Sequence, residues 1–145
     1  PEEGIFPAVT LNPQLKLPTS TGGIGSGKLD FGGSFGLRKV VMNFLCFSDF
    51  GKQKLGDPDG TDYLDPWMYS FGLGRFFFDG WFSALVFYQG ATPSLAGSES
   101  PSQIALGFNV ALTRGYTVSL FGSRGLSSAS PDYGVWLGLQ MRLAD

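Results

Sequence analysis

The sequence contains no histidine and a single cysteine, Cys46, among its 145 residues. One thiol cannot form an intrachain disulfide, and zinc sites in proteins are built mainly from Cys and His, so neither a disulfide framework nor a metal site is expected. The absence of His also excludes Ser-His-Asp and Cys-His catalytic arrangements. No spacing of carboxylates, serines or lysines suggests another one. We therefore expect a chain that is not an enzyme and uses no cofactor.

Charge and long apolar runs are scarce as well. Charged residues make up 15% of the chain, against a usual ~25%, and the net charge of −2 gives no basic footprint for nucleic acid. No window approaches the eighteen apolar residues of a transmembrane helix. That excludes helical spans only, because half of each strand in a membrane barrel faces inward. The start, Pro1-Glu2-Glu3, does not read as a signal peptide, so we expect a mature, trimmed or partial chain.

What the sequence does contain favours strands. Glycine occurs 22 times and aromatic residues are 15% of the chain, a composition that suits β-structure better than helix. In residues 133–143 the odd positions are all apolar or aromatic, and the even ones are small or polar apart from Trp136. Eleven residues exceed the usual five or six of a soluble sandwich and match a tilted strand that crosses a bilayer.

The same alternation predicts eight strands, with connections that are alternately long and short. Tight turns are predicted near Arg38-Lys39, Asp79-Gly80 and Arg114-Gly115, and Asp-Gly between apolar runs indicates a two-residue hairpin turn. This form is typical of an up-and-down outer-membrane barrel. We expect an all-β fold, a transmembrane antiparallel β-barrel of eight strands, as a single domain over residues 1–145. The predicted strands are residues 7–17, 28–38, 40–50, 67–78, 81–89, 103–113, 116–123 and 133–143.

The inward-facing set predicted from this alternation is part polar and part apolar. Charges inside a membrane structure normally pair with each other, so the polar members would plug or line the lumen. The apolar members would form a passage or pocket for a small hydrophobic or aromatic molecule, provided that strands three and five are phased as supposed. The alternative is a lumen filled by its own side chains, for which an eight-stranded barrel is narrow enough. The polar set is Lys16, Asp30, Arg38, Asn109, Gln140 and Arg142; the apolar set is Leu45, Phe47, Met68, Leu85 and Phe87.

Aromatic residues gather at both ends of the predicted strands. Two such girdles are typical of the two interfaces of a membrane. A soluble β-sandwich or lipocalin-like barrel is the alternative, and its outer faces should carry more Lys and Glu. The predicted girdle residues are Trp67, Tyr69, Phe76, Phe78, Trp81, Tyr88, Tyr116 and Tyr133.

Two loops resemble ligand-binding motifs only in part. Residues 22–28 match the G-x-x-x-x-G-K core of a phosphate-binding loop, but Leu29 replaces the Ser or Thr and a strand follows in place of a helix. Residues 57–62 hold three carboxylates but lack the distal Glu and flanking helices of a calcium loop. We interpret the first as a hairpin loop and the second as a solvated turn.

Three segments in order carry a family resemblance: residues 11–19 (LNPQLKLPT), 25–32 (GSGKLDFG) and 125–134 (GLSSASPDYG). They resemble the outer-membrane transporter family of the MetA pathway of phenol degradation. The resemblance implies an outer-membrane β-barrel with a role in uptake of hydrophobic compounds, and no catalytic residues. Members are usually longer before the first segment, so this chain could be the C-terminal part of a larger barrel. They usually end on an aromatic residue, whereas here Leu143 is followed by Ala144-Asp145.

These observations lead to one expected function and one alternative. The expectation is a porin-like barrel of the Gram-negative outer membrane that passively transports or binds small, hydrophobic or aromatic molecules. The alternative is a structural or interaction barrel with a plugged lumen that acts through its extracellular loops in an envelope assembly. Expected partners are outer-membrane lipid or lipopolysaccharide, whose phosphate Arg124 could meet at its outward position, and envelope proteins, but not nucleic acid.

Overall fold

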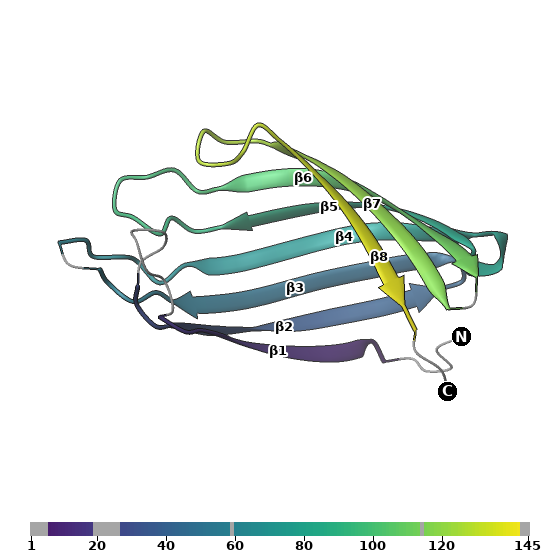
Figure 1. Ribbon diagram of the computed structural model, residues 1–145, viewed down its shortest axis with the longest axis horizontal. Helices are drawn as coiled ribbons and strands as arrows, with labels where there is room; N and C mark the ends of the chain where they lie inside the picture. Colours follow the sequence, from purple (N-terminus) through teal and green to yellow (C-terminus); the bar gives the residue numbers. More distant parts are fainter. Residues whose placement is uncertain (1–5, 19–26, 59, 114, 143–145) are drawn as a thin grey trace.

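One antiparallel sheet of eight strands, in chain order, makes up the molecule (Figure 1). The structure is a computed structural model that describes residues 6–18, 27–58, 60–113 and 115–142. The all-β class, the strand number and the up-and-down order predicted from the sequence are confirmed. The strands are β1 (Ala8–Lys16), β2 (Asp30–Val41), β3 (Phe44–Lys54), β4 (Trp67–Phe77), β5 (Phe82–Ala91), β6 (Ser102–Thr113), β7 (Tyr116–Gly125) and β8 (Tyr133–Met141), with one 3-10 turn, η1 (Phe78–Gly80).

Two of the tight turns differ from their prediction. β2 continues past Arg38-Lys39 to Val41, because Val40 and Val41 still pair with Leu45 and Phe44 of β3, and the turn falls on Met42-Asn43. The Asp79-Gly80 signal marks the right place, but Phe77 pairs with Phe82, so the connection has four residues rather than two. Phe78, Asp79 and Gly80 all have positive φ there. No helix in the described residues is both long and apolar enough to cross a membrane.

The strand ends differ by a few residues from the predicted ones. β3 runs on to Lys54, into the predicted loop 51–65. β8 ends at Met141, and the Arg142 amide donates to the Gly115 carbonyl at 2.8 Å. The last part of the predicted strand, residues 143–145, lies outside the described residues, as do residues 19–26 and 114 in two of the predicted connections.

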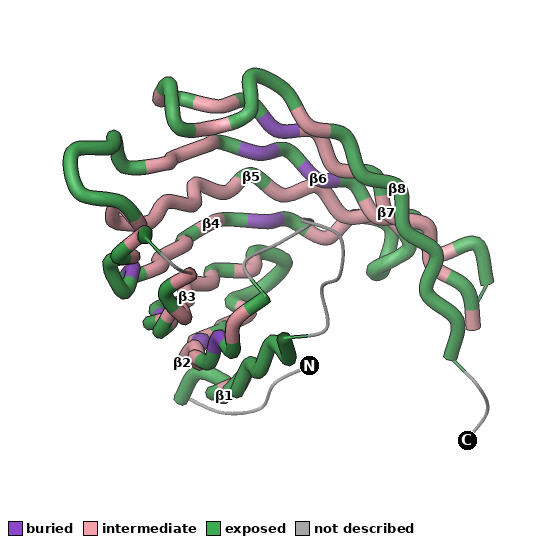
Figure 2. The backbone as a smooth tube through the Cα atoms, turned by 60° about the vertical axis from the view of Figure 1, so that its left-hand side comes forward, coloured by how far each residue is buried: buried purple, intermediate pink, exposed green. Residues whose placement is uncertain are grey.

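The sheet is curled into a half-barrel and does not close on itself (Figure 2). β8 pairs only with β7 and β1 only with β2 in the described residues, so these eight strands form an open half-barrel and not the closed eight-stranded barrel expected from the sequence. Eight strands complete a narrow barrel only when the sheet curls tightly. Here the curl takes them through about half a ring, and one edge each of β1 and β8 stays unpaired.

The sheet has almost no core. Ala105 is the one buried hydrophobic residue among those described, and no side chain there is completely buried. The chain exposes 10401 Å² of surface, whereas a soluble monomer of this size exposes roughly 7,200 Å². Large apolar side chains therefore remain uncovered on a scale that a folded soluble protein does not show.

Candidate functional site

The concave face of the half-barrel carries a cavity that spans six of the eight strands. The strand register places one residue set of every strand on this face, and every buried strand residue belongs to it, including Asp30, Ala105 and Ser123. Side chains from β1 through to β6 line one shared cavity, which only a concave surface allows. We therefore take this face as the candidate site.

The register brings the predicted inward-facing residues onto this one face. In the paired rows, Lys16 lies opposite Asp30, Arg38 opposite Phe47, and Asn109 opposite Ser119. Strands three and five share the phase supposed from the sequence, because Leu45 and Leu85 both pair with Gly74. The concave face holds Lys16, Asp30, Arg38, Asn109 and Gln140 from the polar set, and Leu45, Phe47, Met68, Leu85 and Phe87 from the apolar set; Arg142 follows the end of β8 and is exposed.

Three phenylalanines form an aromatic row across the middle of this face. The ring centroids of Phe47 and Phe87 lie 6.1 Å apart, and those of Phe87 and Phe121 lie 6.4 Å apart, within the range of favourable aromatic pairs. The row joins β3, β5 and β7, so it spans the curve of the sheet. The sequence singled out Phe47 and Phe87 but missed Phe121, although its alternation with Ser119 and Ser123 places it on the same face.

Glycines hold these rings against the wall. A Cβ on Gly72 would lie 2.5 Å from Phe47 Cζ and 2.6 Å from Phe87 Cβ. A Cβ on Gly107 would overlap the ring of Phe121. The rings therefore lie across the backbone of β4 and β6, in the space that a side chain would otherwise occupy. This packing lines the middle of the face with aromatic surface.

A cavity of about 380 Å³, with several polar side chains in its lining, lies at the loop end of the same face. Asp49, Ser70, Gln89 and Gln103 form one row in the register of β3 to β6. Met68 also lines the cavity, while Leu45, Phe47, Leu85 and Phe87 do not. Those four residues form an apolar band on the concave face, and the cavity lies beside it. The sequence did not single out the polar row, although its alternation puts these residues on the inward face.

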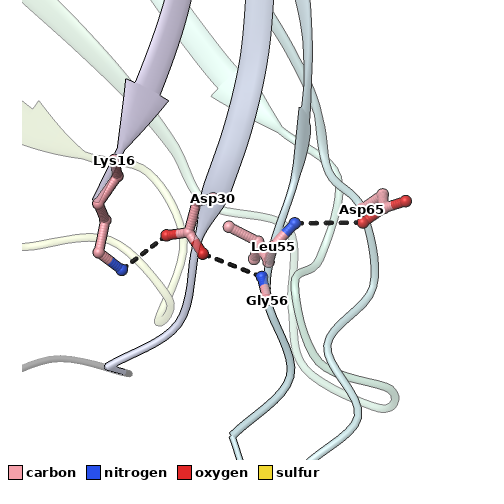
Figure 3. A network of polar contacts seen from close by, with 5 residues as sticks. All are labelled: Lys16, Asp30, Leu55, Gly56 and Asp65. Atoms are coloured by element: carbon pink, nitrogen blue, oxygen red, sulfur yellow. Dashed lines mark hydrogen bonds and ion pairs between the residues drawn. The ribbon is translucent and has the colours of Figure 1, made fainter. Parts of the chain in front are cut away.

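An ion pair between Lys16 of β1 and Asp30 of β2 lies at the loop end of the concave face (Figure 3). Lys16 Nζ lies 2.6 Å from Asp30 Oδ2, and the Gly56 amide donates to Asp30 Oδ1 at 2.9 Å. Nearby, the Leu55 amide donates to Asp65 Oδ1 at 3.2 Å. The hydrogen bond from Gly56 and the pairing with Lys16 hold the pKa of Asp30 below its ordinary value of 3.8. Asp30 lies on the loop side of the Phe31–Lys54 pair, at the mouth of the curled sheet.

The other predicted lumen charges do not form such a plug. Arg38 and Arg142 make no ion pair with the described part of the chain. At the turn end the polar residues bond among themselves: the Asn109 amide donates to Ser83 Oγ at 3.0 Å, and Ser119 donates to Asn109 Oδ1 at 2.6 Å. The concave face is therefore banded, with polar residues at both ends and the aromatic row between them.

The convex face is apolar and differs in charge from the concave one. Charged residues on it are all basic and lie towards the strand ends, leaving the middle without charge. Lys52 Nζ lies 5.0 Å from the ring centre of Trp67, and the Arg75 guanidinium lies 5.2 Å from the ring of Phe44. These contacts hold the cations beside aromatic rings. The basic residues are Lys52, Lys54 and Arg124 at the loop end, and Lys39 and Arg75 at the turn end.

Most of the predicted girdle residues lie on this convex face. Tyr69 stacks near Tyr88, with ring centroids 6.1 Å apart. Phe76 is different, because its pairing with Ser83 puts it on the concave face; the run Phe76-Phe77-Phe78 alternates between faces before the turn. On the convex side are Trp67, Tyr69, Tyr88 and Tyr133 towards the loop end and Tyr116 at the turn end, while Phe78 and Trp81 are exposed in the turn itself.

The two partial motifs add no site. Most of the glycine-rich segment 22–28 lies outside the described residues. In the acidic loop, Asp57 accepts a hydrogen bond from the Tyr63 amide at 2.8 Å, so this carboxylate orders the turn. No group of three or more potential metal ligands occurs in the parts of the chain that are described.

Comparison with known proteins gives no family for this chain. No protein-family model matches it, and no curated protein matches it either. Function is therefore inferred from the arrangement of the two faces.

Proposed function

We propose that this chain forms a wall of a β-barrel in the bacterial outer membrane, and that its concave face passes or binds small, hydrophobic or aromatic molecules. The observation that carries the proposal is the division between the faces. The convex face presents an uncharged apolar band between two basic, aromatic ends, which suits hydrocarbon flanked by headgroups. In a bilayer, the hydrocarbon chains of the lipids would cover this exposed apolar surface.

The role in transport or binding is supported by the concave face. The aromatic row Phe47, Phe87 and Phe121 lies on the concave wall, beside a cavity lined by Asp49, Gln89 and Gln103. Ligand sites are commonly apolar surfaces with a few polar groups that fix orientation. A small aromatic molecule could stack on the row while its polar group meets the cavity. Uptake of hydrophobic compounds is also what the resemblance to the outer-membrane transporter family implies.

The alternative, a plugged structural barrel, has less support from the described residues. It needs charge pairs that cross the lumen, whereas the Lys16–Asp30 pair joins neighbouring strands at the mouth. Action through the long loops stays a prediction, and the contacts of the described loop residues do not favour it.

The experiment has two stages. The full chain is folded into detergent micelles and then into lipid vesicles, and insertion is measured by circular dichroism and by protection from protease. Flux into the vesicles is then compared for a small aromatic alcohol and a sugar of similar size. We expect insertion, and faster entry of the aromatic solute.

Two alanine variants distinguish a role of the concave face in solute entry from a general effect on folding. Phe87→Ala should reduce the preference for the aromatic solute, whereas Val86→Ala, on the convex side of the same strand, should not. A chain that never inserts would contradict the membrane proposal. Insertion with exclusion of every solute would contradict transport alone and favour the plugged barrel.

A further inference from the structure

A second cavity, of about 550 Å³, lies over β6, β7 and β8 at the loop end. Most of the residues that line it belong to the convex face, such as Leu106, Leu120 and Val135. Its lining is almost wholly apolar. From Arg124 to Leu120 it follows four residue steps of β7, roughly 14 Å of strand. The groove thus runs from the loop end towards the uncharged middle of the sheet.

Gly122 opens this groove. A Cβ on Gly122 would have nothing within 4 Å, and its neighbours across the strands are Leu106 and Val135. Gly90, another convex glycine near the loop end, is instead covered by the ring of Tyr69, whose Oη would lie 2.8 Å from a Cβ there. The space over Gly122 is therefore a feature of this part of the sheet and not of convex glycines in general.

A single positive charge marks the loop end of the groove. Arg124 lies two residues beyond Gly122 and pairs in register with Ile104 on one side and Tyr133 on the other. Its side chain is exposed, and no acidic residue lines the groove. Arg presents donors in a geometry that matches phosphate oxygens, and Tyr133 offers a hydroxyl beside it. The groove therefore combines a hydrocarbon-like floor with a cationic end.

We propose that this groove binds a membrane phospholipid with an anionic headgroup. One acyl chain lies over Gly122 between Leu106 and Val135, and the headgroup phosphate is held by Arg124 and Tyr133. The inference rests on the proposed membrane location, since the loop end of the convex face must lie at headgroup level for the phosphate to reach Arg124. It goes further in assigning a lipid class to one position on the sheet.

Native mass spectrometry of the folded full chain in detergent tests the proposal. The protein is titrated with phosphatidylglycerol and, separately, with phosphatidylcholine that has the same acyl chains. We expect phosphatidylglycerol to be retained about five-fold better, the ratio that about one basic residue at a membrane surface supplies. Arg124→Gln should remove this preference and leave phosphatidylcholine retention unchanged. Gly122→Leu, which fills the groove, should reduce retention of both lipids.

Arg75→Gln is the matched control, because Arg75 is also convex and basic but lies at the turn end beside Phe44 and Phe77. The Arg75→Gln variant should still retain phosphatidylglycerol better than phosphatidylcholine. Equal loss in the two arginine variants would overturn the site, since the selectivity would then come from overall charge. Unchanged binding by Gly122→Leu would also overturn it. Circular dichroism of each variant, together with vesicle insertion, shows separately whether the membrane proposal itself holds.

Discussion

At the scale of single residues, glycine decides where the aromatic side chains of this sheet lie. The rings of Phe47 and Phe121 occupy the space that side chains at Gly72 and Gly107 would otherwise fill on the concave wall. No side chain fills the space in which a Cβ of Gly122 would lie, and this space is part of a groove. A glycine can thus hold an aromatic ring against the sheet or leave an open groove. The residues on the neighbouring strands decide which of the two occurs.

The first prediction concerns Gly72. Gly72→Val should destabilise the folded state by about 1–3 kcal/mol, because the new side chain would overpack Phe47, Phe87 and the Val86 carbonyl oxygen, which lies 2.7 Å from the position of its Cβ. The measurement is urea unfolding in micelles. Gly122→Val makes the same chemical change in open space and should be neutral or stabilising. Equal destabilisation by the two substitutions would contradict the packing described.

The second prediction concerns the pH dependence of the Lys16–Asp30 pair. The pKa of Asp30 is lowered in the folded state, so the carboxylate contributes stability that is present above its unfolded pKa and is lost as pH falls through the folded pKa. Asp30→Asn should therefore lower the unfolding midpoint at neutral pH. The difference from the unsubstituted protein should shrink below pH 3.8 and vanish once Asp30 is protonated in the folded protein.

Urea unfolding at a series of pH values measures this difference. Lys16→Gln removes the ion pair from its other side and should also lower the midpoint at neutral pH, while the hydrogen bond from Gly56 remains. A destabilisation by Asp30→Asn that is the same at every pH would show that the charge of Asp30 does not matter.

At the scale of elements, the strands are set by alternation and the turns by local backbone conformation. The eight strands occupy the segments where side chains alternate, including β3 and β5, whose two apolar faces made their phase ambiguous. Only the pairing between strands resolves this ambiguity. Leu45 and Leu85 both pair with Gly74, so they lie on the same face of the sheet. The turns are less well specified. The β2–β3 turn places Met42, a bulky residue, at φ 54°.

The third prediction concerns this turn. Met42→Gly should stabilise the fold by about 1 kcal/mol, because glycine adopts positive φ without the steric cost that Met bears. Met42 is 87% exposed, so the substitution removes little packing. Met42→Ala shortens the side chain but keeps the Cβ, and should bring no gain. The unfolding midpoints of the two variants, compared with the unsubstituted chain, test the prediction; equal gains would mean that backbone strain is not the cause.

At the scale of the whole molecule, the half-barrel has two exposed surfaces and two unpaired edges. Within the described parts of the chain, the outer edges of β1 and β8 have no paired strand, and such edges are usually paired or covered in proteins. The convex face concentrates apolar side chains such as Phe71, which is 56% exposed. Both features are costly in water. In a membrane the face is satisfied by lipid, and the edges require further strands.

The fourth prediction tests the proposed lipid contact of the convex face. Phe71→Arg places a charge in the uncharged middle of β4 and should reduce the free energy of folding into vesicles by about 2–4 kcal/mol. Ser70→Arg, one residue away on the concave face beside Asp49, should cost much less. Folding yield and unfolding in vesicles of matched thickness measure both. A larger loss for Ser70→Arg would reverse the assignment of the faces.

The sequence by itself determined the fold class and the strand number, and it assigned the two faces of every strand except β3 and β5. Side chains alternate clearly along the other strands, so residues as far apart as Lys16 and Asn109 could be assigned to one face without coordinates. Only the tertiary structure decided how far the sheet curls, and therefore that β8 does not meet β1. Curvature is the sum of small twists over all strand pairs, and no single segment encodes it. Contacts between neighbouring strands also decided the placement of the aromatic row, the cavity at Asp49 and the groove over Gly122, because alternation gives the face of a side chain but not the volume left beside it.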